Sequence, residues 1–446
     1  MRLFSFFQGN NRSSKAKKNI FISSVFKAGD TLIYLMLVPI TLDYLNPFEY
    51  GIWLTLNSIL GWINSFDIGL GNGLRNKLSE AIANEDKEAA RKYVSTAFVL
   101  LSVLGCLLCI LGIYLINKID WYQLLNVSTK NVNNLVDIIA FSYIFFCVNF
   151  VLKTIGNIYQ ALQLPSALHI MNFFGHLLAL VLICILKQVV EGSLLWIAIV
   201  YSAAPPFIYL CAYPLTFFCL FKYLKPSVKY FDRNSVKGLL DLSIIFFMLQ
   251  ISSIVLFSLS NLIISNIFGP TEVTAYNIAQ RYFSVVSMIF GVILTPMWSA
   301  ATDAYVKGEL LWIKNTMKNL RQVLILVGIL LVVMVIISPV IFDLWIGDEV
   351  NIPVALVGLI ALYNYILMYS LCYSYFLNGI GKLKLQAINT ILVAICFYPL
   401  CHYLALNFRV YGVIICMCIL NLPGAIINTI QFNKVLNKKD KGLWAK

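Results

Sequence analysis

The chain has 446 residues, of which 60% are hydrophobic and 12% are charged, and its formal net charge is +13. Soluble domains contain about 25% charged residues. The composition therefore excludes a water-soluble fold, and it predicts one integral membrane domain because no polar stretch is long enough to form a separate soluble domain.

Twelve apolar segments have the length of a membrane span, since a helix needs about 20 residues to cross the hydrocarbon core. We therefore predict an all-α integral membrane fold. Residues 1–18 form a basic arm, and no small-residue cleavage site follows it, so we expect the first helix to be retained. The segments are approximately 19–42, 49–69, 93–116, 135–161, 166–186, 193–221, 238–268, 273–298, 320–342, 353–377, 385–406 and 410–432.

Lysine and arginine are distributed unevenly between the two sides of these spans. With the N-terminus in the cytoplasm, 26 of the 33 fall in cytoplasmic segments such as the 70–92 loop. The opposite side holds Lys118, Lys130, Lys187 and Arg409. Cytoplasmic loops carry the excess of positive charge, so we expect both termini in the cytoplasm. Topology thus accounts for the positive charge without nucleic acid, and it leaves contact with anionic lipid headgroups open.

An internal repeat emerges when the sequence is offset by 223 residues. Pro47 then meets Pro270, and Glu49 meets Glu272. Two six-helix halves explain this, and chance matching in apolar sequence is the alternative. Because six is even, the halves would be parallel repeats with a substrate path between them. The expected organisation is a basic arm (1–18), an N-terminal lobe (19–221), an inter-lobe loop (222–237), a C-terminal lobe (238–433) and a basic tail (434–446).

Few ionisable side chains fall at membrane depth, where each costs about 2.5–3.5 kcal/mol and usually faces a protein interior or a water-filled cavity. Lys27 and Asp30 share one face of the first helix and are able to pair, either lining a cavity or only locking helices together. Lys153 lies deep in the fourth span, and for Arg281 in the eighth, snorkelling outward is the alternative. Together Lys27, Lys153 and Arg281 predict a positively biased cavity, suited to a diphosphate or an acidic sugar rather than a cationic drug.

A glycine-rich run follows the second span. Asp67 is followed by Gly69, Gly71 and Gly73, and then by Arg75. Glycine lets the backbone bend or approach another helix closely, so we predict a gate or hinge here, with a simple helix-terminating loop as the alternative.

Two carboxylates are candidates for cation or proton coupling, Asp30 and Asp241. Asp241 begins the seventh span, where a carboxylate also complements a helix N-terminus, so structural capping is its alternative role. His169 and His176 lie seven residues apart on the fifth span, and we interpret them as hydrogen-bonded core residues rather than a proton relay.

No spacing in the sequence indicates an enzyme. All 11 cysteines fall in apolar runs, and the chain contains neither a phosphate-binding glycine loop, nor a zinc motif, nor a nucleophile elbow. We therefore expect no catalytic residues, no metal and no cofactor.

Two runs resemble a known family. Residues 50–53 and 66–80 resemble the first-half signature of Wzx-type O-antigen and polysaccharide flippases, and residues 268–281 resemble its second-half counterpart. These flippases belong to the MATE-like multidrug/oligosaccharidyl-lipid/polysaccharide exporter superfamily. The resemblance implies a V-shaped bundle of two six-helix lobes in the bacterial inner membrane. It also implies an undecaprenyl-diphosphate-linked oligosaccharide as substrate, with membrane lipids and polysaccharide polymerase or assembly proteins as partners.

The function expected from this resemblance is flipping of the lipid-linked oligosaccharide from the cytoplasmic to the outer leaflet, for assembly of O-antigen, capsule or exopolysaccharide. A multidrug or cation antiporter of the same superfamily is the nearest alternative, and it should carry cavity carboxylates and few cavity cations. A membrane-embedded glycan polymerase is less consistent with the sequence, because the longest outer loop, about 118–134, holds only Lys118, Asp120 and Lys130 as basic or acidic groups.

Overall fold

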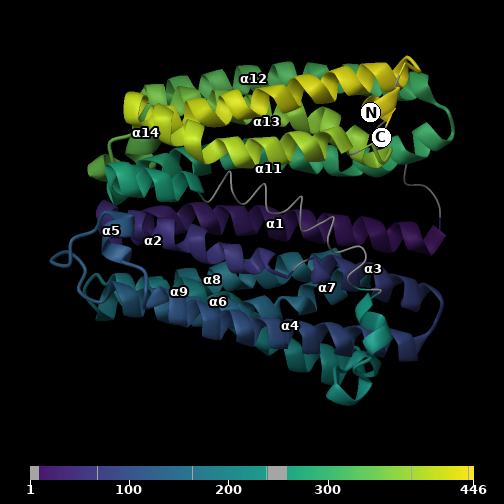
Figure 1. Ribbon diagram of the computed structural model, residues 1–446, viewed down its shortest axis with the longest axis horizontal. Coiled ribbons are helices and arrows are strands. Elements are labelled where there is room, and N and C mark those ends of the chain that lie inside the picture. The colour runs from purple at the N-terminus through teal and green to yellow at the C-terminus, as the bar shows by residue number, and fades with distance from the viewer. Residues whose placement is uncertain are drawn as a thin grey trace. The chain divides into compact units, whose positions relative to one another are not determined.

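The computed structural model describes residues 10–445 apart from 68, 163, 238, 240–258, 383 and 440, and nearly all of this part is helical (Figure 1). The chain divides into two compact units. The first contains Met1–Asn46 and Leu56–Gln250, and the second contains Pro47–Thr55 and Ile251–Lys446. The lobe boundaries expected from the sequence stay a prediction. They place Pro47–Thr55 in the N-terminal lobe, whereas this stretch belongs to the second compact unit.

The first unit is a bundle of long apolar helices. Within it α1 packs on α8, α8 on α9, α9 on α6, and α6 on α4. The side chain of Asp86 accepts a 2.9 Å hydrogen bond from the Ala89 amide and so caps the start of α4, one of the positions where helical amides have no internal acceptor. The helices are α1 (Asn10–Tyr44), α3 (Leu70–Ala83), α4 (Lys87–Ile116), α5 (Trp121–Leu125), α6 (Leu135–Leu152), α7 (Thr154–Ala161), α8 (Pro165–Val189) and α9 (Leu194–Pro214).

The second unit contains the remaining long helices. The second predicted span begins here as α2 (Pro47–Leu60) and continues in the 3-10 turn η2 (Gly61–Ser65) of the first unit. In Figure 1, α13 and α14 lie side by side, and α13 also packs on α11 and α12. The helices are Leu259–Phe268, α11 (Pro270–Val306), α12 (Leu310–Ile346), α13 (Val354–Gly379) and α14 (Lys384–Leu436).

Helix α14 holds two of the predicted spans. Arg409 has φ 54° and ψ −145°, which breaks the helix into 384–408 and 410–436. Eight helices in the described ranges, with α14 taken as one, are long and apolar enough to cross a membrane. Helices α2 and α11 occupy two further predicted spans. The all-α membrane fold is as predicted, and a count of twelve spans is consistent with it.

The stretch 70–92 is helical rather than an irregular loop, because α3 fills most of it and α4 begins at Lys87, while its cytoplasmic location stays a prediction. The charges of this stretch suggested a loop, but its apolar residues recur every three or four positions, the period of an amphipathic helix. The residues on that face are almost fully buried. They are Leu70, Leu74, Leu78 and Ala81, which are 4%, 0%, 0% and 5% exposed.

The internal repeat is visible in the helix boundaries. Helix α2 begins at Pro47 and α11 at Pro270, while α4 begins at Lys87 and α12 at Leu310. Both pairs of helix starts are 223 residues apart, the offset found in the sequence. Proline suits the first helical position, where its missing amide hydrogen has no acceptor to lose.

The two proline-started helices also pack on each other within the second unit. The Thr274 hydroxyl donates a 2.6 Å hydrogen bond to the Pro47 carbonyl. In the counterpart of this contact, a Cβ added to Gly51 would lie 1.8 Å from the Pro270 carbonyl oxygen. Gly51 and Thr274 are themselves 223 residues apart, so the two contacts are related as in a two-fold arrangement, in which residue i meets j and j meets i.

We predict that Gly51→Ala destabilises the protein. The added methyl group overlaps the Pro270 carbonyl, and overpacking of this kind costs about 1–3 kcal/mol. The measurement is the thermal unfolding midpoint of the detergent-solubilised chain. Gly61→Ala is the matched control, since nothing lies within 4 Å of a Cβ added there. Equal midpoints for the two variants would contradict this account of the packing.

Candidate functional site

Asp30 of α1 is directed across the helix interface to α8. Its Oδ1 lies 2.6 Å from Nδ1 of His176, and the two side chains are 24% and 33% exposed. The ring of Tyr34 lies 5.7 Å from the imidazole. The contact joins α1 to α8 through two polar side chains in otherwise apolar helices. The histidine that the sequence suggested as a core residue is thus the partner of a candidate coupling carboxylate.

The pairing of Lys27 with Asp30, which their spacing allowed, is not the one found, because the ion pair that Asp30 makes is with His176. Helices α1 and α8 approach closely enough for this, and a Cβ added to Gly29 would lie 2.8 Å from Cε2 of Phe173. Lys27 lies one turn before Asp30 on α1, and its carbonyl accepts a 3.0 Å hydrogen bond from the Thr31 hydroxyl.

Asp67 lies between η2 and α3 and caps the start of α3. Its carboxylate accepts hydrogen bonds from the amides of Gly69 and Gly71, at 3.0 Å and 3.3 Å, and the side chain is 7% exposed. Gly69 has φ 73°, a conformation that is costly for residues with a Cβ. The glycine therefore permits the turn, and the carboxylate satisfies amides that have no acceptor within the helix.

The rest of the glycine-rich run joins α3 to α7. A Cβ added to Gly71 would lie 2.3 Å from Nδ2 of Asn157, so the two helices touch there. Further along, Arg75 Nη1 donates a 3.2 Å hydrogen bond to Gln160 Oε1. Buried Gly73 lies inside α3, where its amide donates to the Gly69 carbonyl. Gly69 is thus required by the turn before α3, and Gly71 by the close approach of α3 and α7.

Lys153 lies at the junction of α6 and α7, where the helix is interrupted. The Gly156 amide donates to the Lys153 carbonyl over 2.9 Å, which tightens the backbone into a short turn. The half-buried side chain places its ammonium 5.3 Å from the centre of the Phe150 ring, and Asp67 acts on it electrostatically. Asp67 and Lys153, found in different predicted spans, thus each lie at a helix break.

Arg281 belongs to the second unit, on α11. Its side chain is 9% exposed, and its guanidinium lies 5.9 Å from the centre of the Tyr50 ring, which is 1% exposed. A cation over an aromatic face at this distance is attracted by the ring quadrupole. The guanidinium is thus held inside the unit rather than extended from its surface.

A network of amides and hydroxyls, which reasoning from charges did not identify, follows the same helix. Asn364 of α13 donates to Gln280 over 3.4 Å and accepts from Ser287 over 3.3 Å, while Gln280 donates to the Tyr276 hydroxyl over 3.2 Å. The signal in the sequence was polar residues at intervals of three and four along an apolar segment. Such groups are suited to hydrogen-bond the hydroxyls of a sugar.

Asp241 lies outside the described residues. In the part of the chain that the structure describes, no three histidine, cysteine, aspartate or glutamate side chains lie together in a way that suits a metal ion.

Comparison with known proteins gives a family and a fold. Residues 16–301 match the family described as "Polysaccharide biosynthesis protein". One curated relative, the "Putative O-antigen export protein" of Yersinia pseudotuberculosis, is 24% identical over 364 residues, which cover 78% of this chain and 79% of the relative. Another, the "Putative O-antigen transporter" of Salmonella typhi, is 23% identical over 296 residues, and these cover 64% of each chain.

Solved structures with the same fold are transporters. An inward-facing multidrug resistance MATE family transporter of the MOP superfamily has a TM-score of 0.74 at 16% identity, with 94% of this chain and 98% of that chain covered. A MOP superfamily transporter from Pyrococcus furiosus has a TM-score of 0.65 at 17% identity, with 96% and 97% covered. At these identities the likeness shows the fold. Because the family match spans well over half of the sequence, the chain belongs to the polysaccharide biosynthesis protein family and has the MATE-like fold.

Proposed function

We propose that this chain flips an undecaprenyl-diphosphate-linked oligosaccharide from the cytoplasmic to the outer leaflet of the bacterial inner membrane. The flipped unit would serve assembly of a surface polysaccharide such as O-antigen, capsule or exopolysaccharide. Family membership and two relatives named for O-antigen export or transport support the class of substrate. In this proposal the chain transports its substrate without changing it chemically.

The observation that carries the proposal is that three basic residues lie on long apolar helices of the two units. Lys27 lies on α1, Lys153 at the break between α6 and α7, and Arg281 on α11. Charged groups at membrane depth are costly and usually serve an ion or substrate path. A diphosphate repays that cost, because charge-assisted hydrogen bonds to phosphate are among the strongest that proteins make.

In the proposed mechanism, the diphosphate and glycan enter from the cytoplasmic leaflet while the polyprenyl chain stays in lipid. Lys27, Lys153 and Arg281 are the residues proposed to bind the diphosphate. The predicted lobes 19–221 and 238–433 then rock about the site and expose the glycan to the other side, as in other transporters built from repeats. The breaks at Asp67 and Lys153 supply the hinge.

We propose Asp30 as a coupling carboxylate, with His176 as its partner. A proton on this pair makes the cluster around Lys27 more positive and strengthens its attraction for a diphosphate, whereas loss of the proton weakens it. Asp241 stays a second coupling candidate. Polysaccharide polymerase or assembly proteins are the partners proposed for the flipped product, and both chain termini are proposed to lie in the cytoplasm.

A multidrug or cation antiporter is the second candidate, because the fold is shared with MATE multidrug transporters and the first unit contains Asp30 and Asp67. An antiporter would use these carboxylates to bind a cationic drug or ion. Lys27, Lys153 and Arg281 would then bind no substrate. The first experiment below separates the two functions.

We predict that the intact chain restores surface polysaccharide in a flippase-deficient bacterium that makes the cognate lipid-linked sugar. Lys153→Ala and Arg281→Ala should each lower the restored polymer about tenfold or more, the value of a charge-assisted hydrogen bond of about 1.5–3 kcal/mol. The measurement is surface polymer at equal membrane abundance of each variant.

Lys318→Ala is the matched control, since this lysine is exposed on α12 and should be dispensable. If the intact chain restores no polymer but exports cationic dyes, the flippase proposal fails and the antiporter takes its place.

We predict that Asp30→Asn removes the response of transport to an imposed proton or sodium gradient, because an amide neither releases a proton nor neutralises a cation. The measurement is gradient-driven transport in proteoliposomes. Asp43→Asn is the control, since Asp43 pairs with Lys187 at the other end of α1. An unchanged gradient response of Asp30→Asn would remove Asp30 from the coupling mechanism.

A further inference from the structure

The inter-lobe linker (222–237) is fastened to the first helical turns of α4. The Arg91 side chain donates a 3.2 Å hydrogen bond to the Lys225 carbonyl, and its guanidinium lies 3.9 Å from the centre of the Tyr230 ring. The Ser95 hydroxyl accepts from the Ser227 amide at 3.2 Å. The linker therefore does not behave as a free tether over these residues.

Two further contacts complete this attachment. Leu224 is fully buried in the core of the first unit. Thr96 Oγ1 accepts a 3.0 Å hydrogen bond from the Asp232 amide. The Asp232 carboxylate in turn accepts a 2.7 Å hydrogen bond from Ser235 Oγ. That hydroxyl is the largest influence holding the pKa of Asp232 below its usual range, and the Asn234 and Ser235 amides add to it.

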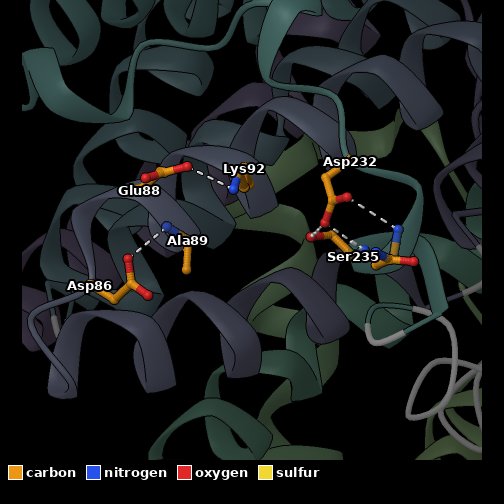
Figure 2. Close-up of polar contacts among 7 residues, drawn as sticks. Asp86, Glu88, Ala89, Lys92, Asp232 and Ser235 are labelled. Carbon is orange, nitrogen blue, oxygen red and sulfur yellow. Dashed lines mark hydrogen bonds and ion pairs between the residues drawn. The ribbon is translucent and has the colours of Figure 1, made fainter.

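Three acidic side chains in or near the linker make hydrogen bonds or an ion pair with neighbouring residues, as Figure 2 shows. Asp86 accepts from the Ala89 amide, Glu88 lies 2.7 Å from Lys92, and Asp232 is held by Ser235. None of these three contacts involves a basic side chain of the linker. The positive charge of the linker is thus presented outward, on side chains that are all exposed: Lys222, Lys225, Lys229, Arg233 and Lys237.

Apolar side chains are exposed among these cations. Val228 is 78% exposed and Phe231 is 40% exposed, although the backbone on both sides of them is fixed to α4. The linker surface also continues the outer surface of the preceding span, because the Lys225 ammonium lies 4.3 Å from the centre of the Phe218 ring, which is 49% exposed. Phe218 belongs to the last turn of that span, so Lys225 lies where the lipid-facing surface ends.

We propose that the linker is an interfacial anchor that binds the anionic headgroups of membrane lipids. Val228 and Phe231 enter the headgroup region, and Lys225, Lys229 and Arg233 contact the phosphates. Basic residues with interspersed apolar side chains bind membrane surfaces in this way, and lysine stems lie along apolar surface while their ammonium groups reach the headgroups. A soluble protein partner would leave the continuity with the lipid-facing surface unexplained.

The proposal takes from the proposed function only the cytoplasmic orientation of the linker, and its test does not use transport. The full-length chain with Val228→p-benzoylphenylalanine is reconstituted in dioleoylphosphatidylcholine vesicles with or without dioleoylphosphatidylglycerol, irradiated, and examined by mass spectrometry. We expect lipid adducts at position 228, more abundant when phosphatidylglycerol is present. Adducts that are absent, or equally abundant in both vesicles, would overturn the proposal.

The contribution of charge is tested in the same labelled chain with Lys225→Gln, Lys229→Gln and Arg233→Gln combined. Each basic residue near an anionic surface contributes about fivefold to binding. The triple variant should therefore lower the phosphatidylglycerol-dependent adduct at position 228 roughly 100-fold. The matched control removes the same charge from the exposed tail, through Lys438→Gln, Lys439→Gln and Lys441→Gln, and should leave adducts at position 228 unchanged.

Two further outcomes would contradict the proposal. If inorganic phosphate added before irradiation prevents the phosphatidylglycerol-dependent adduct, and sodium chloride at the same ionic strength does not, the linker holds a site for a soluble anion rather than a lipid surface. Irradiation in native membranes that yields a protein adduct instead of a lipid adduct would show a protein partner. A chain that fails to restore polysaccharide but forms the headgroup-dependent adduct would contradict the flippase function and leave the anchor intact.

Discussion

The membrane interior supplies no water to satisfy a backbone amide or carbonyl, so every break in a spanning helix must satisfy its own polar groups. The described chain meets this constraint locally. At the break before α3, the Asp67 carboxylate accepts from the amides of Gly69 and Gly71. At the break after α6, the Lys153 carbonyl accepts from the Gly156 amide. At the first break a side chain satisfies the backbone, and at the second the backbone satisfies itself.

Contacts between α3 and α7 link the glycine-rich run to the segment that follows Lys153. The sequence predicted the glycine-rich run and Lys153 as functional residues, but as separate features. Gly71 brings α3 against Asn157 of α7, and Arg75 bonds to Gln160 of the same short helix. Helix α7 is thus tied to α3 rather than only to α6, and the two segments that follow the breaks are expected to move as one body.

The sequence was sufficient for features that depend on local composition. Hydropathy predicted the helical membrane fold, and the division of α14 at Arg409 falls between the predicted spans 385–406 and 410–432. It was insufficient where the partner of a side chain depends on which helices pack together. Spacing allowed Asp30 to pair with Lys27, whereas packing of α1 on α8 brought it to His176. The amides around Asn364 were missed because they carry no charge.

The paired contacts of the two proline-started helices tolerate different substitutions. Gly51 and Thr274 occupy corresponding positions on the two sides of the two-fold arrangement. The Thr274 hydroxyl bonds to the Pro47 carbonyl, and the absence of a side chain at Gly51 allows the Pro270 carbonyl to approach. The two matching contacts thus differ in what they allow: a serine at 274 would keep the hydrogen bond, while any side chain at 51 would overlap the Pro270 carbonyl.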